Sequence, residues 1–422
     1  MKSWRRVIRA QATVVRNVLR GWPVAYTGVS GMTIDEDDLA LAARLLDDVS
    51  AWDNPAPVEA FERQFAEWNG SRRAFAFASG RVALGAALAA LDLAPGDEIV
   101  VPAYTCVVVV NAIRGAGLTP VFADIELETY GLDKDALCGA MSSRTRAVIV
   151  QHLYGFVARD LDAIVEIARR RGARVIEDCA QAMGARYRGR NVGSSGDAAI
   201  FSGDPSKPFT CIQGGIATAD DDAVIARLAS IRGAAPVHAA DAIAQRLRNV
   251  ELNYVIHKDP QRWWKAELVW RRRADDYLYG IPAPEIAGAL PADAGFRMAA
   301  PIAALAAHQL RKLDHYNDRR RSNAGRWAGW CRDHNFEAPL TVPASTPIML
   351  RYPVLVTPEM KRDLRWAYRT LGVVPGTWFV SHLHPAPGAV AGVPNATRAV
   401  EQCVNFPTLY YEDRWIGAPP SA

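Results

Sequence analysis

The chain has 422 residues, of which 50% are hydrophobic and 22% are charged, as is ordinary for a soluble globular protein. This length favours two domains, one of them large, over a single small core. The 49 basic and 45 acidic side chains leave a net charge of +4, so bulk electrostatics favour no polyanionic partner, and no nucleic-acid partner is expected.

The cysteines and histidines argue against a metal centre. The six cysteines are scattered without CxxC pairs, and the eight histidines form no HExxH array. We therefore expect no metal site and a reduced, cytoplasmic setting. His382 and His384 lie two residues apart in an expected loop, where a polar wall is a simpler interpretation than a zinc site.

Residues 1–22 predict a separate helix. Apolar residues recur at helical spacing, basic residues occupy most other positions, and no acidic residue occurs. Pro23 ends the pattern, so residues 1–29 are interpreted as a basic amphipathic N-terminal extension.

Short apolar runs alternate with helical patterns between residues 30 and 249. The expected strands are AFAFA (74–78), EIVVP (98–102), PVFAD (120–124), AVIVQHL (147–153) and RVIED (174–178). The expected helices are RVALGAALAAL (81–91), CVVVVNAIRGAG (106–117), DALCGAM (135–141), LDAIVEIARRRG (161–172) and AVIARLASIRG (223–233). This alternation predicts right-handed crossovers and a large α/β domain around a mostly parallel sheet. Such sheets bind ligands at the carboxyl ends of their strands, where Ser79, Tyr104, His152 and Asp178 fall.

The pattern changes after residue 249. Residues 250–295 are rich in Trp and Arg and lack clear strand alternation, so they are interpreted as a mainly helical insert. A long helix is expected from about Ala299 to Trp327, followed by shorter strand and helix signals. Residues 296–422 are therefore predicted to form a smaller α+β C-terminal domain.

The stretch from Val175 to Gly215 carries the main chemical signal. It places Asp178 at the end of an apolar strand and Lys207 in a small-residue loop one crossover later. A lysine amine forms a Schiff base with an aldehyde, and a buried carboxylate keeps a pyridine nitrogen protonated, so this pair suits pyridoxal 5'-phosphate (PLP). Taken alone, Asp178 could simply cap the next helix, and Lys207 could simply be exposed to solvent.

The turn after the first expected strand adds a candidate anion site. Ser79 and Gly80 lie between a strand and a helix N-terminus, where free backbone amides and the helix dipole favour a phosphate. A simple helix cap is the alternative. The turn is neither a GxGxxG fingerprint nor a Walker motif, which disfavours dinucleotides and nucleoside triphosphates. Combined with Asp178, Ser202 and Lys207, it favours a PLP site.

Six motifs, in order, resemble the DegT/DnrJ/EryC1/StrS family of fold type I PLP-dependent aminotransferases, which act on sugar nucleotides. They are VPAYT, PVFADIE, TRAVIVQHLYG, VIEDCAQAMGARYRGRNVGSSGDAAIFS, the Lys207 loop ending in Gly214 and Gly215, and GFRMAAPIAALAAHQLRKLDHYNDRRR (295–321). The resemblance implies that Lys207 is the Schiff base lysine and proton shuttle, and that Asp178 pairs with the pyridinium nitrogen.

The resemblance also implies a set of cofactor contacts. Ala180 is expected to pack on one face of the ring and Gln181 to lie by the ring hydroxyl. His152 is expected in the same site because it falls at the end of an expected strand, not because of the resemblance. The phosphate is expected to be held by Ser79, Gly80, Arg81 and Ser202. A homodimer with active sites at the subunit boundary is implied as well.

Four features depart from the family pattern. Arg81 stands where a small hydroxyl residue is common, and it either gives the phosphate a charged partner or points away as a surface arginine. Cys106 stands where an aromatic residue usually stacks on the ring, so that stacking is lost or passes to Tyr104. Gly295 replaces an asparagine that reaches the partner subunit's phosphate. The segment 250–295 is longer than usual and borders the expected sugar-nucleotide region.

The expected reaction moves an amino group from an amino acid, by family resemblance L-glutamate, to a nucleotide-linked keto sugar. Lys207 favours transamination, because relatives that dehydrate a sugar carry histidine at this position. The acceptor and the carbon that is aminated have no recognisable motif.

Two other functions stay open. The first is an aminotransferase that works at a membrane. Two segments, residues 1–22 and RWWKAELVWRRR (262–273), combine tryptophan with arginine, which suits the surface of an anionic membrane such as the inner membrane face. The acceptor would then be a lipid-linked or other keto substrate that is not a sugar nucleotide. Alternatively, the helix docks on the partner subunit and the insert covers the active site. A PLP-binding regulatory protein without turnover is the second option.

Overall fold

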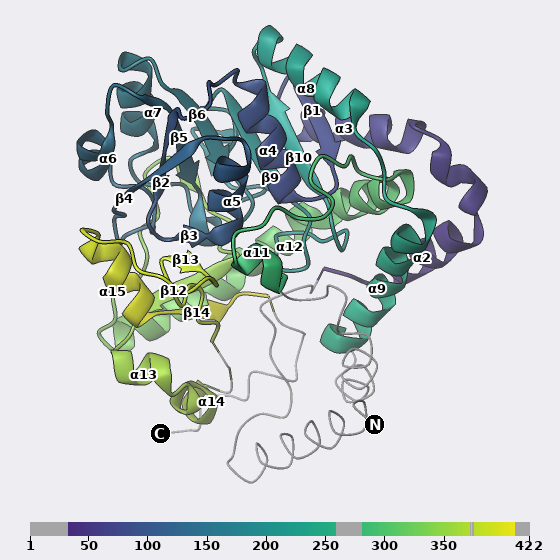
Figure 1. The fold of residues 1–422 in the computed structure, drawn as a ribbon. Helices are drawn as coiled ribbons and strands as arrows, with labels where there is room; N and C mark the ends of the chain where they lie inside the picture. Colours follow the sequence, from purple (N-terminus) through teal and green to yellow (C-terminus); the bar gives the residue numbers. More distant parts are fainter. Residues whose placement is uncertain (1–32, 259–280, 372, 374, 410–422) are drawn as a thin grey trace, which may run out of the picture.

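A seven-stranded sheet forms the centre of the molecule. The computed structural model describes residues 33–258, 281–371, 373 and 375–409 (Figure 1). The strands are β1 (Arg73–Phe77), β2 (Glu98–Pro102), β4 (Thr119–Ala123), β5 (Thr145–Gln151), β6 (Arg174–Asp178), β9 (Ala198–Ser202) and β10 (Gly215–Ala219). They lie in the order β1-β10-β9-β6-β5-β2-β4, and all neighbours are parallel except those of β10.

The composition of the strands explains why this sheet is internal. β2, β9 and β10 are buried at every position, so both faces of each strand need a covering layer. The five strands predicted from the sequence are observed to within two residues at each end. β9 and β10 were not predicted, because AAIFS and GIATA consist mostly of small residues with weak strand signals.

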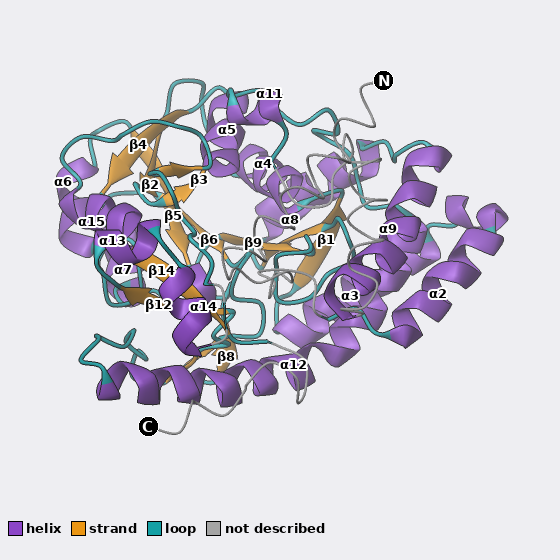
Figure 2. Ribbon diagram, turned by 90° about the horizontal axis from the view of Figure 1, so that it is seen from below, coloured by secondary structure: helices purple, strands orange, loops and turns teal. Residues whose placement is uncertain are grey.

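Helices cover both faces of the sheet, as Figure 2 shows from below. One face carries α4 (Gly80–Ala90), α5 (Val107–Gly115) and α8 (Asp222–Ala234). The other carries α3 (Ala56–Asn69), α6 (Lys134–Ala140), α7 (Leu161–Arg170) and the first half of α12 (Ala300–Asp333). In α7, Leu161, Ile164, Val165 and Ala168 recur at helical spacing and are all buried. The predicted α/β class with a mostly parallel sheet is confirmed.

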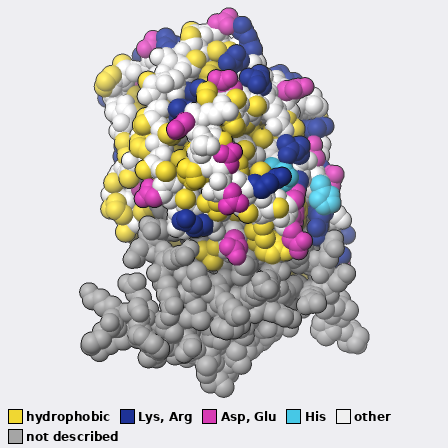
Figure 3. Space-filling model, turned by 90° about the vertical axis from the view of Figure 1, so that its right-hand side faces the viewer, with side chains coloured by type: hydrophobic (Ala, Val, Ile, Leu, Met, Phe, Trp, Pro, Cys, Tyr) yellow, Lys and Arg dark blue, Asp and Glu magenta, His cyan; other side chains and the backbone are white. Residues whose placement is uncertain are grey.

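Polar contacts fix helix α2 (Glu36–Asp47) to α12. Asp35, at the N-cap of α2, and the buried Asp38 form ion pairs with Lys312 of α12. Gln309 Nε2 donates a hydrogen bond to Asp38 Oδ1 at 2.7 Å. Helix α9 (Ala240–Lys258) packs against both helices. On this side of the molecule, acidic and basic side chains lie interspersed among hydrophobic ones (Figure 3).

The second half of α12 enters a smaller α+β unit. Its apolar side chains pack on the antiparallel pair β12 (Arg351–Leu355) and β14 (Cys403–Pro407). The helices of this unit are α13 (Pro358–Arg362), α14 (Arg365–Leu371) and α15 (Pro394–Gln402). The short parallel pair β3 (Thr105–Cys106) and β13 (Leu383–His384) joins it to the sheet. The remaining short elements are η1 (Val49–Asp53), η2 (Leu153–Gly155), α11 (Ala283–Ile286), β7 (Arg186–Tyr187), β8 (Arg190–Asn191) and β11 (Ser345–Thr346).

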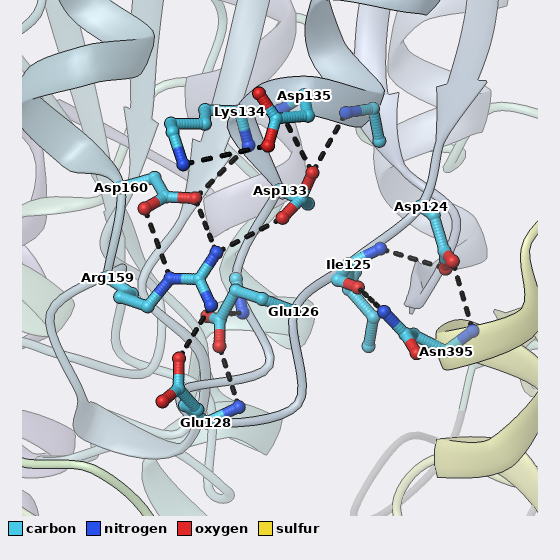
Figure 4. Close-up of polar contacts among 12 residues, drawn as sticks. Asp124, Ile125, Glu126, Glu128, Asp133, Lys134, Asp135, Arg159, Asp160 and Asn395 are labelled. Carbon is cyan, nitrogen blue, oxygen red and sulfur yellow. Dashed lines mark hydrogen bonds and ion pairs between the residues drawn. The ribbon is translucent and has the colours of Figure 1, made fainter.

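Asp124, which directly follows β4, fastens the smaller unit to the sheet (Figure 4). Asp124 accepts hydrogen bonds from the backbone N–H groups of Asn395 (3.0 Å) and Ala396 (2.8 Å), in the first turn of α15. A carboxylate at this end of a helix also interacts favourably with the helix dipole. Nearby, Arg159 forms ion pairs with Glu128, Asp133 and Asp160.

One of the predicted domain limits falls inside a continuous helix, and another assigns the first half of a helix to the wrong core. Helix α9 begins at Ala240 and runs through the limit at residue 249. The first half of α12 belongs to the core of the sheet, although residues 296–422 were predicted to form the smaller domain. The division into 30–249, 250–295 and 296–422 stays a prediction, and the course of these helices argues for moving both limits.

The two basic, tryptophan-rich stretches lie outside the described residues. Residues 1–29 fall wholly in the undescribed N-terminal part, and 262–273 fall within the undescribed part 259–280. Among the helices that the structure describes, none combines the length and the apolar character needed to cross a membrane.

Candidate active site

The turn after β1 forms a narrow backbone cradle. Ser79 caps α4, and its side chain accepts a hydrogen bond from Val82 N. A Cβ atom at Gly80 would lie 2.8 Å from the Cβ of Ser202, at the end of β9, and a Cβ at Gly215 would lie 2.0 Å from Ser79 O. Glycine is therefore required at both positions for this close approach. The arrangement brings Ser79, Gly80 and Ser202 together at the N-terminus of an 11-residue helix, where an anion is stabilised.

Asp178 lies at the end of the central strand β6 and is buried. Its Oδ1 accepts a hydrogen bond from Ala180 N (3.0 Å), and its Oδ2 accepts one from Gln151 Nε2 (3.1 Å). Gln151 ends β5 and pairs in register with Asp178. Gln151 was not identified from the sequence alone. Its place at the end of the strand next to Asp178 could have indicated that it belongs to the site.

His152 lies elsewhere than expected. Its Nε2 hydrogen-bonds Glu177 Oε2 at 2.9 Å, and its Nδ1 accepts from Ala158 N. Both side chains are fully buried. Successive residues of a strand point to opposite faces of the sheet, so the side chains of Glu177 and Asp178 lie on opposite faces. The His152 side chain lies on the same face as Glu177, its hydrogen-bond partner. The structure therefore does not bring His152 to the Asp178 carboxylate.

Glu177 is held as a charged group inside the protein. Burial acts to raise its pKa, but hydrogen bonds from His152 and from backbone N–H groups outweigh burial and leave the pKa below its usual value. The donors include Gly193 N, Ser195 N and Gly196 N, at 2.6–3.0 Å. Glu177 thus organises the loop that precedes β9.

The Lys207 loop is closed at its base and held from α12. Gly203 N donates to Gly214 O at 2.8 Å, and Lys207 N donates to Asp204 O at 3.0 Å. The buried Arg320, on α12, donates through Nη2 to Pro208 O at 2.7 Å. Burial lowers the pKa of Arg320 to about 9. This contact fixes the peptide next to Lys207, and sequence reasoning did not identify Arg320.

Arg81 is an internal residue. Its guanidinium forms an ion pair with Glu285 of α11, and the two side chains are 12% and 4% exposed. The α11 segment is held further by Asn111 Nδ2, which donates to Glu285 O at 2.7 Å. The expected alternative of a surface arginine is therefore wrong. The role of Arg81 at the phosphate stays a prediction.

Tyr104 and Cys106 differ in how far they reach the site. Tyr104 has no exposed surface, and its hydroxyl is hydrogen-bonded to Tyr154, Trp378 O and Phe379 N. It therefore presents no face on which a bound ring could stack. Cys106 is partly exposed, and burial raises the pKa of its thiol, while the charges of Lys207 and Arg81 oppose that effect. Its thiol thus lies within electrostatic range of both cations.

Gln181 and Ala180 follow Asp178 directly. Gln181 Oε1 accepts a hydrogen bond from Tyr154 N at 3.0 Å, which fixes its amide beside the sheet edge. Ala180 is partly exposed, and its N–H holds Asp178. Both lie at the same end of β6 as Asp178.

The smaller α+β unit supplies a further wall that the sequence did not predict. Lys207 Nζ lies 5.5 Å from the centroid of the Trp378 ring, and Arg351 Cζ lies 4.0 Å from the same centroid. Burial lowers the pKa of His384 to about 4, with further lowering by the charges of Lys361 and Lys207. Lys207 is thus enclosed by groups from both units.

The residues present fit PLP. The cradle that a Cβ at Gly80 would fill offers backbone amides and two serine hydroxyls to a phosphate. A buried carboxylate and a lysine amine, both needed for a pyridine aldehyde, follow at the same sheet edge. These elements define the class of fold type I transferases.

The chain belongs to the DegT/DnrJ/EryC1/StrS aminotransferase family, whose model matches residues 33–411. The family resemblance inferred from the sequence is therefore confirmed. GDP-perosamine synthase of Caulobacter vibrioides is 42% identical over 173 residues, which are 41% of this chain and 46% of that protein. L-glutamine:scyllo-inosose aminotransferase of Streptomyces griseus is 42% identical over 178 residues, 41% of this chain and 42% of that protein. The chain thus matches less than half the length of these two curated relatives.

Solved structures resemble the chain over most of its length. The structure of S. venezuelae DesV in complex with a ketimine intermediate has a TM-score of 0.67 and 27% identity, and the match covers 88% of this chain and 89% of that one. An aminotransferase from Psychrobacter cryohalolentis gives a TM-score of 0.69 at 24% identity, with 89% and 93% covered. At 24% identity, the match to the Psychrobacter protein shows a similar fold.

Proposed function

We propose that this chain is a PLP-dependent aminotransferase that moves an amino group from an amino acid to a nucleotide-linked keto sugar. The observation that carries the proposal is the meeting of the Ser79 turn, Asp178 and the Lys207 loop at the carboxyl edge of one sheet. Membership of the aminotransferase family over residues 33–411 supports it.

Each part of the cofactor would have its own holder. Ser79, Gly80 and Ser202 would bind the phosphate, with Arg81 as an additional charged partner. Asp178 would face the ring nitrogen, Gln181 the ring hydroxyl and Ala180 one face of the ring. Gln151 and Ala180 N hold the two carboxylate oxygens of Asp178, which keeps that carboxylate oriented without further reorganisation.

When bound, PLP supplies an aldehyde that carries the amino group and a ring that accepts electrons from the α-carbon of the donor. The negative charge of Asp178 would keep a proton on the ring nitrogen. Lys207 would hold the cofactor covalently at rest. Once the donor amine has released it, Lys207 would take the proton from the donor α-carbon, and it would return a proton to the acceptor carbon in the second half of the reaction.

The proposal also covers the identities of the amino donor and of the acceptor. We propose L-glutamate as the donor, and the name of the Streptomyces relative makes L-glutamine the alternative to test. A sugar-nucleotide acceptor is supported by the names of relatives such as UDP-N-acetyl-3-dehydro-alpha-D-glucosamine 3-aminotransferase of Acidithiobacillus ferrooxidans, 38% identical over 218 residues, 51% of this chain. A homodimer is also proposed, and light scattering on the purified protein tests it.

Lys207→Ala tests the reaction. The variant should lose the visible absorbance of the lysine-bound cofactor and all detectable turnover, measured with L-glutamate and L-glutamine on GDP- and UDP-linked keto sugars and on scyllo-inosose. Lys134→Ala, at a lysine that is 42% exposed and far from the loop in sequence, is the matched control. Full activity in Lys207→Ala would refute the proposal. An absorbance band that no amino donor bleaches would instead identify a PLP-binding regulatory protein.

A further inference from the structure

The candidate site lacks an aromatic side chain from the expected position. Cys106 stands there, and Tyr104, the expected substitute, is fully buried. The face of the site on this side must therefore be formed by another part of the chain.

The segment 376–384 of the smaller unit lies directly beside Cys106. Strand β13 pairs in parallel with β3, with Leu383 opposite Thr105 and His384 opposite Cys106. Thr105 N donates to His382 O at 2.9 Å. This pairing fixes the segment against the edge of the site.

Trp378 is the aromatic residue that this segment brings to the lysine. Its ring centroid lies 5.5 Å from Lys207 Nζ, and the residue is partly exposed. Arg351 Cζ lies 4.0 Å from the same centroid. Cations gather at an indole because its ring face is electron-rich.

Buried groups of both units hold the backbone of Trp378. Tyr104 and Tyr154 donate hydrogen bonds to Trp378 O, and the Tyr104 hydroxyl also accepts from Phe379 N at 2.8 Å. Trp378 N donates to Asn405 Oδ1 at 2.9 Å. Both peptide groups next to the indole are thus hydrogen-bonded to buried side chains, which holds the backbone that carries the ring.

We propose that Trp378 supplies the aromatic wall against the cofactor ring that Cys106 does not provide, and that Tyr104 is the residue that positions it. The inference rests on the proposed function. A protonated pyridine ring is electron-poor, and an indole is the side chain whose face best attracts such a ring. The small Cys106 side chain leaves room for a wall that comes from the smaller unit.

Cofactor binding tests this proposal. Apoprotein of the wild type, Trp378→Leu and Trp378→Phe is titrated with PLP, and binding is followed by visible absorbance and by the circular dichroism of the cofactor band. Loss of an aromatic contact should raise the Kd about 2- to 12-fold in Trp378→Leu and weaken the dichroic band. Trp378→Phe should fall between the two, because it keeps a smaller aromatic face.

Trp366→Leu is the matched control. Trp366 lies in the same unit, is also partly exposed and stacks on Trp330 at 6.0 Å. Its replacement should leave the Kd unchanged. Cys106→Phe in the Trp378→Leu background should recover part of the lost affinity and of the dichroic band, which a merely structural role of Trp378 does not predict.

The outcomes separate this inference from the proposed function. A Kd and a dichroic band in Trp378→Leu equal to those of the wild type would overturn the role of Trp378 and leave the aminotransferase proposal intact. Equal losses in Trp366→Leu and Trp378→Leu would overturn it as well. If Trp378→Leu does not fold, Trp378→Phe decides: a raised Kd and a weaker dichroic band support the wall, and wild-type values count against it. A wild-type protein without a Lys207-dependent band would refute the proposed function itself.

Discussion

The two walls of the candidate site are built in different ways. The sheet side comes from the carboxyl ends of three strands, with Ser79 after β1, Asp178 at the end of β6 and Ser202 at the end of β9. The opposite side comes from the smaller unit, which brings Trp378 and Arg351 from places far from Lys207 in the sequence. The first wall depends on local turns and sheet register, whereas the second depends on long-range contacts.

This difference indicates where tolerance to change should lie. Side chains of the sheet wall would touch the cofactor directly, so their replacement should change chemistry more than stability. The second wall is held by buried tyrosines and an asparagine, so its replacement should change stability together with affinity. Four predictions test this contrast, from the largest expected effect to the smallest.

Asp178→Asn should lower turnover by on the order of 100-fold or more, because an amide cannot hold the ring proton by its charge. Glu177→Gln, one residue earlier and on the opposite face of β6, should leave turnover of the folded protein near the wild-type value. It should lower the free energy of unfolding by about 2–4 kcal/mol, since buried N–H donors lose a charged acceptor. Steady-state kinetics and urea unfolding measure the two effects. A large loss of turnover in Glu177→Gln would show that the faces are not independent.

Arg81→Met and Glu285→Gln should each lower the free energy of unfolding by about 3–5 kcal/mol, because each removes one partner of a buried ion pair. The double variant should lose less than the sum of the two, which a double-mutant cycle measures. Additive losses would contradict a direct ion pair.

The same two variants decide whether Arg81 is a phosphate ligand. If it is, Arg81→Met should raise the Kd of PLP clearly more than Glu285→Gln does. Equal values would assign Arg81 solely to holding α11 against the phosphate turn.

His384→Gln should flatten the pH dependence of stability. His384 has a pKa of about 4 in the folded chain against a reference value of 6.5, so the unfolded chain binds more protons between these values. The free energy of unfolding should therefore fall by up to about 3 kcal/mol as the pH is lowered from 6.5 to 4. Urea unfolding at several pH values measures this loss in the wild type and its reduction in the variant. His334→Gln, at an exposed histidine after α12, should not reduce it.

Tyr104→Phe should have the smallest effect, a loss of about 1–2 kcal/mol in the free energy of unfolding, because the buried Phe379 N–H loses its acceptor. It should also weaken PLP binding, by less than Trp378→Leu does. Tyr187→Phe, which removes an exposed hydrogen bond to Asp162, serves as the control. Unchanged stability in Tyr104→Phe would mean that this hydroxyl does not hold the Trp378 segment.

Most of the sheet could be predicted because its strands are strongly apolar and its helices regularly spaced. Such periodicity identified β2 and β6 to the residue. It did not identify β10, whose GIATA sequence follows the Lys207 loop without a crossover helix and runs antiparallel to its neighbours. β10 lies between β9 and the edge strand β1 and pairs with both.

The candidate site was partly predictable for the same reason. Asp178 and Lys207 stand out by their chemistry. His152 was predicted in the site, but its neighbour Gln151 is the residue that contacts Asp178. A shift of one residue along a strand moves a side chain to the opposite face of the sheet, and the sequence pattern did not resolve that shift. Glu285, Arg320 and Trp378 carried no sequence signal, because their importance comes from partners more than 100 residues away or in another unit.

Helix α12 also sets how the chain can be divided. Ala303 and Leu313 are buried in the core of the sheet, while Ala324 and Trp327 are buried in the core of the smaller unit, and one unbroken helix joins them. A fragment that ends before α12 would expose the apolar layer that this helix covers, and a fragment that begins with it would carry half a helix whose apolar side has no partner. The two cores are thus separate in space, but neither unit can be expected to fold stably when the chain is cut beside α12.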